Sequence, residues 1–128
     1  MVLTTVGKPE DALPHLRKMT TLIEIEPAKS LRQNLWFAAS ALRDLKVIKS
    51  IELGRINTLL KAGANLDAAL LFAPPGYRIV KVEEEGARWG ALVRGQPGMT
   101  GAYGHGPVPA AAVAVAFARV TLSALEGS

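Results

Sequence analysis

The sequence predicts an α+β fold in which N-terminal helices pack with an antiparallel β-hairpin, an optional short N-terminal strand and a buried C-terminal helix. Three observations support this fold class. Apolar residues recur at helical spacing between residues 30 and 72, two β-prone segments flank a turn near residue 85, and residues 108–125 are almost entirely apolar. A length of 128 residues with 49% hydrophobic residues suits one domain with its own core.

The first 26 residues carry mixed signals. Gly7, Pro9 and Pro14 lie among charged residues, so residues 1–18 are predicted to form an irregular or flexible leader. The single α+β domain is then expected to span residues 19–128. Within it, residues 20–25 place leucine and isoleucine between threonines and glutamates, which predicts one short strand.

Three helices are predicted in the next part of the chain. Ser30 is the expected N-cap of the first, whose apolar stripe continues to about Lys46. The second is expected to begin at Ser50 and to end just before Gly63. A short third helix is predicted over residues 66–72, ahead of two prolines.

A β-hairpin is predicted from residue 77 to residue 94, with Glu85 and Gly86 as its two-residue turn. The predicted buried face consists of Val80, Val82, Trp89, Ala91 and Val93. An isolated two-stranded ribbon is marginally stable, so another element must cover this face. The apolar helix that begins at Pro107 or Pro109 is the expected cover.

This C-terminal helix is predicted to be buried in the fold and not to span a membrane. Its apolar run contains Arg119 and falls short of the roughly 20 apolar residues that a bilayer requires. Because it is apolar around most of its circumference, either the N-terminal helices or a second copy of the chain must cover the rest, which leaves a homodimer as an alternative.

The composition limits the chemistry that can be expected. The chain has no cysteine, which excludes disulfides and thiol catalysis and fits a reducing compartment. Charged residues near the N-terminus do not fit a secretory signal peptide, so a cytoplasmic location is expected. Glu83, Glu84 and Glu85 are consecutive and point to alternating sides of a strand, so no metal site is predicted. No cofactor is expected.

The positive charge defines the first candidate site. The formal net charge of +4 lies entirely in residues 1–64, which indicates a face for an acidic partner or a solvated surface. The candidate partner-binding residues are Arg32, Arg43, Lys46, Lys49, Arg55 and Lys61. Trp36 and Phe37 lie among them and leave open the stacking of single-stranded nucleic acid bases, although core packing competes as an explanation.

The second candidate site is the glycine-rich segment 101–107, predicted to be a loop that leads into the N-terminus of the last helix. Free backbone N–H groups and the helix dipole favour an anion at such a position. The candidate ligand-loop residues are Tyr103, Gly104, His105 and Gly106. His105 is the only candidate general base there, with a solvated loop histidine as the alternative.

The order of several elements resembles a known family. A short helix with Leu66 and Asp67, a hairpin carrying Trp89, a Gly/Ala-rich segment, a proline at 107 or 109 and an alanine-rich helix are similar to the phage α/β sandwich (ABA sandwich) domain of small bacteriophage and prophage proteins. The resemblance covers about residues 55–126. It implies this fold and a phage-type origin, and no particular activity.

Three classes of function follow. The favoured class is a small non-enzymatic phage-type accessory protein that binds and modulates a host or phage macromolecule, most readily a protein, for example as an inhibitor of a host defence system. It is favoured because the chain offers a full-sized core and no convergent catalytic set. The alternatives are a nucleic-acid-binding protein that uses the basic half, and a small enzyme or ligand carrier with its site at residues 101–107.

Overall fold

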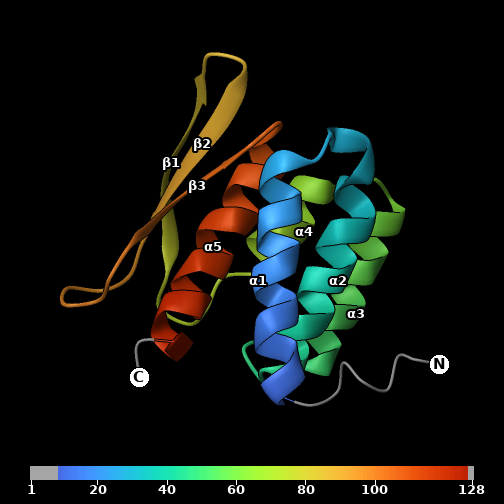
Figure 1. The fold of residues 1–128 in the computed structure, drawn as a ribbon, viewed down its shortest axis with the longest axis vertical. Coiled ribbons are helices and arrows are strands. Elements are labelled where there is room, and N and C mark those ends of the chain that lie inside the picture. Colours follow the sequence, from blue (N-terminus) through green and yellow to red (C-terminus); the bar gives the residue numbers. More distant parts are fainter. Residues whose placement is uncertain (1–8, 127–128) are drawn as a thin grey trace.

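Five α-helices and one three-stranded antiparallel sheet form the part of the chain, residues 9–126, that the computed structural model describes (Figure 1). The helices are α1 (Pro9–Ile25), α2 (Leu31–Asp44), α3 (Ser50–Lys61), α4 (Asn65–Leu70) and α5 (Pro109–Glu126), with a short 3-10 turn, η2 (Ala28–Ser30), before α2. The strands are β1 (Arg78–Glu85), β2 (Arg88–Arg94) and β3 (Ala102–Gly106), in the order β1-β2-β3. The predicted α+β class, with its hairpin and its buried C-terminal helix, is confirmed.

Helix α5 lies at the centre of the fold. In Figure 1 the sheet stands on one side of α5, α1 lies on the other, and α2 and α3 follow beyond α1, while α4 also contacts α5. Residues 110–118 are all buried. By length and composition α5 could cross a membrane, but 67% of its apolar window is buried inside this fold. The apolar circumference that suggested a homodimer is therefore covered within one chain.

Helix α1 contradicts two predictions, the irregular leader and the N-terminal strand. A helix spans residues 9–25, so the irregular leader is wrong from residue 9 onward and the strand at residues 20–25 is wrong, while residues 1–8 lie outside the described residues. Pro14 removes one helical hydrogen bond and so concealed the helix from the sequence pattern. Burial of an apolar stripe at helical spacing compensates for that loss. The stripe consists of Ala12, Leu16, Met19 and Ile23.

The starts of α2 and α3 differ from the predicted caps. Ser30 makes no side-chain capping bond, because it ends the 3-10 turn that precedes α2. Ser50 is the first residue of α3, and the N-cap position is held by Lys49. The Lys49 backbone N–H donates to Glu52 Oε1 at 2.8 Å, so a carboxylate in the first turn satisfies this end of the helix.

The ends of α2 and α3 are built alike. In each, the third residue after the end of the helix donates its N–H back to a carbonyl five residues earlier: Val47 to Leu42 at 2.9 Å, and Ala64 to Leu59 at 2.8 Å. This arrangement requires a left-handed residue just before that donor. Gly63 takes this role at φ +80° as predicted, whereas α2 uses Lys46 at φ +64°.

The hairpin forms with a register two residues from the predicted one. Glu85 pairs with Arg88, so the turn is Gly86 and Ala87, and Val82 pairs with Ala91 instead of Trp89. A shift of two residues leaves every side chain on its predicted face, since strand side chains alternate with period two. The rule fails at the start of β1, where Ile79 packs against the core. A bulge between Ile79 and Lys81 leaves Val80 41% exposed, although it was predicted to be buried.

Residues 102–106 form the edge strand β3, where a glycine-rich loop was predicted. The glycines are explained by packing. A Cβ on Gly104 would lie 2.3 Å from Ala116 N and 2.4 Å from Ala112 O, so the strand backbone rests directly on α5. Gly106 approaches Ala111 in the same way. Small residues on both elements thus allow the sheet to pack closely on the helix.

Candidate functional site

A groove between α2 and α3 brings together one aromatic and three cationic side chains of the helical side. Its volume is about 450 Å³. One wall consists of Lys29, Arg32, Gln33 and Trp36, from η2 and α2, and the other consists of Asn57, Leu60 and Lys61, from α3. Helical spacing explains each wall, because residues three and four apart share a face. The two walls meet because α2 and α3 are neighbours that run in opposite directions.

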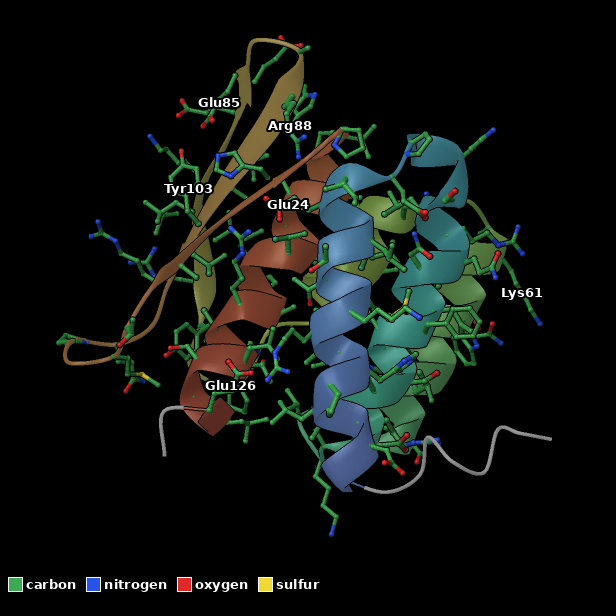
Figure 2. All side chains as sticks on the ribbon, viewed as in Figure 1. Glu24, Lys61, Glu85, Arg88, Tyr103 and Glu126 are labelled. Atoms are coloured by element: carbon green, nitrogen blue, oxygen red, sulfur yellow. The ribbon has the colours of Figure 1, made fainter. Side chains whose placement is uncertain are left out.

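The side chains of this groove differ in exposure. Leu60 is 2% exposed and forms an apolar floor, and the indole of Trp36 is half-buried beside it. Lys29, Arg32 and Lys61 are exposed. Figure 2 shows Lys61 extending from the side of the molecule that is away from the sheet. The groove therefore combines a half-buried aromatic surface with exposed cations.

The cations of the groove are not neutralised within the described part of the chain. Neither Lys29, Arg32 nor Lys61 has a carboxylate of residues 11–126 within ion-pair distance, and no carboxylate lines the groove itself. Three uncompensated charges around a low-dielectric groove create a positive potential that favours an anion. We refer to the seven lining residues, Lys29, Arg32, Gln33, Trp36, Asn57, Leu60 and Lys61, as the α2–α3 groove.

The six predicted basic residues do not form one continuous face. Arg32 and Lys61 line the α2–α3 groove, whereas Lys46 and Lys49 lie at the opposite ends of both helices, in the connection between them. Arg43 is paired with Asp44, its Nε lying 3.1 Å from Oδ1. Arg55 belongs to a separate groove on another side of α3. Of the six predicted residues, only Arg32 and Lys61 thus come together, where α2 begins and α3 ends.

Lys29, Gln33 and Asn57 were missed as site residues. Asn57 precedes Lys61, and Gln33 precedes Trp36, by about one helical turn, so the sequence places these two amides on faces shared with residues that were considered. What the sequence lacks is the pairing of the two walls, which depends on tertiary packing. Phe37, which was weighed together with Trp36, contacts His15 of α1 instead, with ring centroids 6.3 Å apart.

A second groove, of about 460 Å³, is largely apolar. Ile51, Gly54, Arg55 and Thr58 contribute the outward side of α3, and Leu71 completes it next to α4. Ile51 is 67% exposed, so the groove offers apolar surface to solvent. Its only charged lining residue is Arg55. It has no polar set that would orient a small ligand.

The second predicted site lies on the open face of the sheet. Tyr103 and His105 project from β3 on the face opposite α5, and both reach Glu85 of β1. Figure 2 shows Tyr103 and Glu85 on the same side of the sheet. The Tyr103 hydroxyl donates to Glu85 Oε2 at 2.9 Å, and His105 Nε2 lies 3.3 Å from Glu85 Oε1. The hydrogen bond to Glu85 raises the pKa of Tyr103. Gly90, on the strand between them, makes room for this carboxylate, since a Cβ there would lie 2.4 Å from Glu85 Oε2.

These contacts of Tyr103 and His105 with Glu85 connect β3 to β1 across the sheet and do not form an anion site. Gly104 and Gly106 face α5 and are covered by it, so they offer no backbone cradle. The carboxylates of Glu83 and Glu85 stand beside Tyr103 and oppose the approach of a further negative charge. Tyr103 and His105 are half-buried and Glu85 is exposed on this face of the sheet.

The edge of β3 is also occupied. Arg119 of α5 donates to the Tyr103 carbonyl at 2.8 Å and to Glu24 of α1 at 2.8 Å, and Arg88 of β2 donates to the Glu24 carbonyl at 2.7 Å. These bonds fasten the sheet to α1 and α5. They also block part of the edge to which another strand could pair.

The search for metal ligands and the comparisons with known proteins identify no further functional site. Within residues 11–126 there is no group of three or more histidine, aspartate or glutamate side chains that could hold a metal ion. Comparison of the chain with protein families, curated proteins and solved structures gives no match. The resemblance to the phage α/β sandwich domain stays a prediction.

Proposed function

We propose that this protein is a non-enzymatic binding protein that holds an anionic segment of a partner macromolecule in the α2–α3 groove. The observation that carries the proposal is the convergence of three cations without carboxylate partners on a groove that also contains Trp36. The interaction-protein class expected from the sequence agrees with it. Modulation of a host or phage partner, including inhibition of a defence system, remains part of this proposal.

Two charge-matched variants test the proposal. The first, Lys29→Gln with Arg32→Gln and Lys61→Gln, removes the cations of the groove. The second, Lys46→Gln with Lys49→Gln and Arg55→Gln, removes three exposed cations that do not line it. Both lower the net charge by the same amount, so any difference between them is due to position.

Binding to labelled poly-glutamate, polyphosphate and a thymidine oligonucleotide is then measured by fluorescence anisotropy at two salt concentrations. The groove variant is expected to lose most of the affinity of the parent for at least one of these polyanions, and the control variant to retain it. Equal loss in both variants would show that net charge alone drives binding. Absence of binding by the parent to all three polyanions would reject the proposed function.

A further inference from the structure

We propose that the anionic partner is a single-stranded nucleic acid, with one base stacked on Trp36 and the neighbouring phosphates on Lys29, Arg32 and Lys61. This inference rests on the proposed function and names the class of its ligand. The three cations alone would bind any polyanion without distinguishing between them. The choice among polyanions depends on the uncharged members of the groove.

Trp36 supplies a stacking surface. Its side chain is half-buried in the wall of the groove, so the indole is held in position while part of it faces solvent. Every base has a π-face, and stacking on a protein aromatic typically changes affinity by about 5- to 150-fold per base. An acidic peptide has no group that must stack there. The aromatic wall therefore favours a nucleic acid.

The amides of the groove point to the same ligand. Gln33 and Asn57 lie on opposite walls, and each side chain carries both a hydrogen-bond donor and an acceptor. Carboxylates accept hydrogen bonds and cannot donate them, so in an acidic peptide segment only the backbone N–H groups could donate to the two amide oxygens. Base edges present donors and acceptors together. The two amides can thus bond a base that lies between them.

The strand must be single. In a duplex each base is stacked between its neighbours and cannot lie on Trp36 without being extruded, which breaks its pairing and stacking. A single strand exposes its bases freely. With three cations, the groove neutralises about three phosphates, so the logarithm of affinity should fall with the logarithm of salt concentration with a slope of about −2.

The decisive experiment compares two strands that differ only in their bases. One is a thymidine oligonucleotide of about ten nucleotides, and the other is an abasic strand of the same length and charge. The parent protein is expected to bind the thymidine strand about 5- to 150-fold more tightly. Trp36→Leu should remove this difference and bind both strands with the affinity of the abasic one. Trp89→Leu, which changes the other tryptophan, on the sheet, should keep the preference.

A fluorescence measurement keeps the test independent of the stability of Trp36→Leu. In the Trp89→Phe variant Trp36 is the only tryptophan, so its emission reports on the groove directly. The thymidine strand is expected to quench this emission and the abasic strand to leave it unchanged. Lys61→Gln should make the salt slope shallower by about 0.7, one phosphate contact, without altering the preference for bases.

The outcomes separate this inference from the proposed function. If the abasic strand binds as tightly as the thymidine strand, or a duplex of the same length binds as tightly as either, the base-stacking inference is wrong and the groove is a general polyanion site. If poly-glutamate binds most tightly and Trp36→Leu has no effect, the partner is an acidic protein. If the parent binds none of these probes, the proposed function itself fails.

Discussion

Replacing Gly104 by alanine tests the packing of β3 on α5. The added Cβ would lie 2.3 Å from Ala116 N and 2.4 Å from Ala112 O. Both are backbone atoms of a buried helix and cannot rotate away. The strand would have to retreat by about 1 Å to approach the roughly 3.5 Å separation of ordinary contacts. Overpacking of this kind costs about 1–3 kcal/mol, and we expect Gly104→Ala to lower the free energy of unfolding by about 2–3 kcal/mol.

Two other glycines provide matched controls for the same change. A Cβ at Gly90 would meet the carboxylate of Glu85, which can swing aside, so Gly90→Ala is expected to cost less than Gly104→Ala. Nothing lies within 4 Å of a Cβ at Gly54, inside α3, and Gly54→Ala should stabilise the protein by about 0.5–1 kcal/mol because alanine is the better helix former.

Urea denaturation followed by circular dichroism measures all three variants. Their m-values should match that of the parent, which makes the midpoints comparable. The expected order of stability is Gly54→Ala, parent, Gly90→Ala and Gly104→Ala. If Gly104→Ala unfolds within about 0.5 kcal/mol of the parent, β3 does not rest on α5 as described and the explanation of its glycines is wrong.

Three further predictions address other parts of the fold. Lys46→Gly should stabilise the protein by about 1 kcal/mol in a denaturation assay, because its left-handed backbone (φ +64°) favours glycine as at Gly63, and no gain would contradict this account of the end of α2. Trp89→Ala should cost about 1.5–3 kcal/mol, less than a fully buried tryptophan, because Trp89 is only half-buried; a cost below 0.5 kcal/mol would show that it packs on nothing. His15 has its pKa lowered from 6.5, first by burial and then by Lys18, with Asp44 opposing. Below about pH 6.5 the unfolded state binds more protons at this residue, so stability should fall as the pH decreases, more steeply in the parent than in His15→Gln, and parallel pH profiles would refute this assignment.

Much of the fold could be predicted because local signals and tertiary packing agree. The apolar stripe of α2, the left-handed Gly63 and the alanine-rich α5 each mark an element that the structure contains. The hairpin faces were also predicted correctly for Trp89 and Val82, although the register was two residues away. Turn chemistry alone did not decide between Glu85-Gly86 and Gly86-Ala87, and a period of two hides an even shift.

The failures occurred where tertiary contacts override local patterns. Pro14 is a poor helix residue, and the burial of Leu16 and its neighbours on the α1 stripe outweighs it. Glycines at 104 and 106 have the composition of a mobile loop, and only the presence of α5 on one side shows that they belong to a packed strand. Arg32 and Trp36 share a face that the sequence reveals, but the opposite wall of their groove comes from α3 and required the helix pairing.

The cations of the α2–α3 groove and the carboxylates of the hairpin turn lie on different sides of the molecule. Glu85 lies on the sheet at one side of the molecule, and Lys61 lies at the other side, beyond α1 and α2 (Figure 2). Charges separated by more than about 8–10 Å in solvent are largely screened at physiological salt. The carboxylates at the hairpin therefore do not compete with a ligand for the groove cations. On the sheet, Arg78, Lys81, Arg88 and Arg94 balance the carboxylates of Glu83, Glu84 and Glu85, so that side is close to neutral, whereas an anionic partner that approaches the α2–α3 groove meets three cations without ion-pair partners among the described residues.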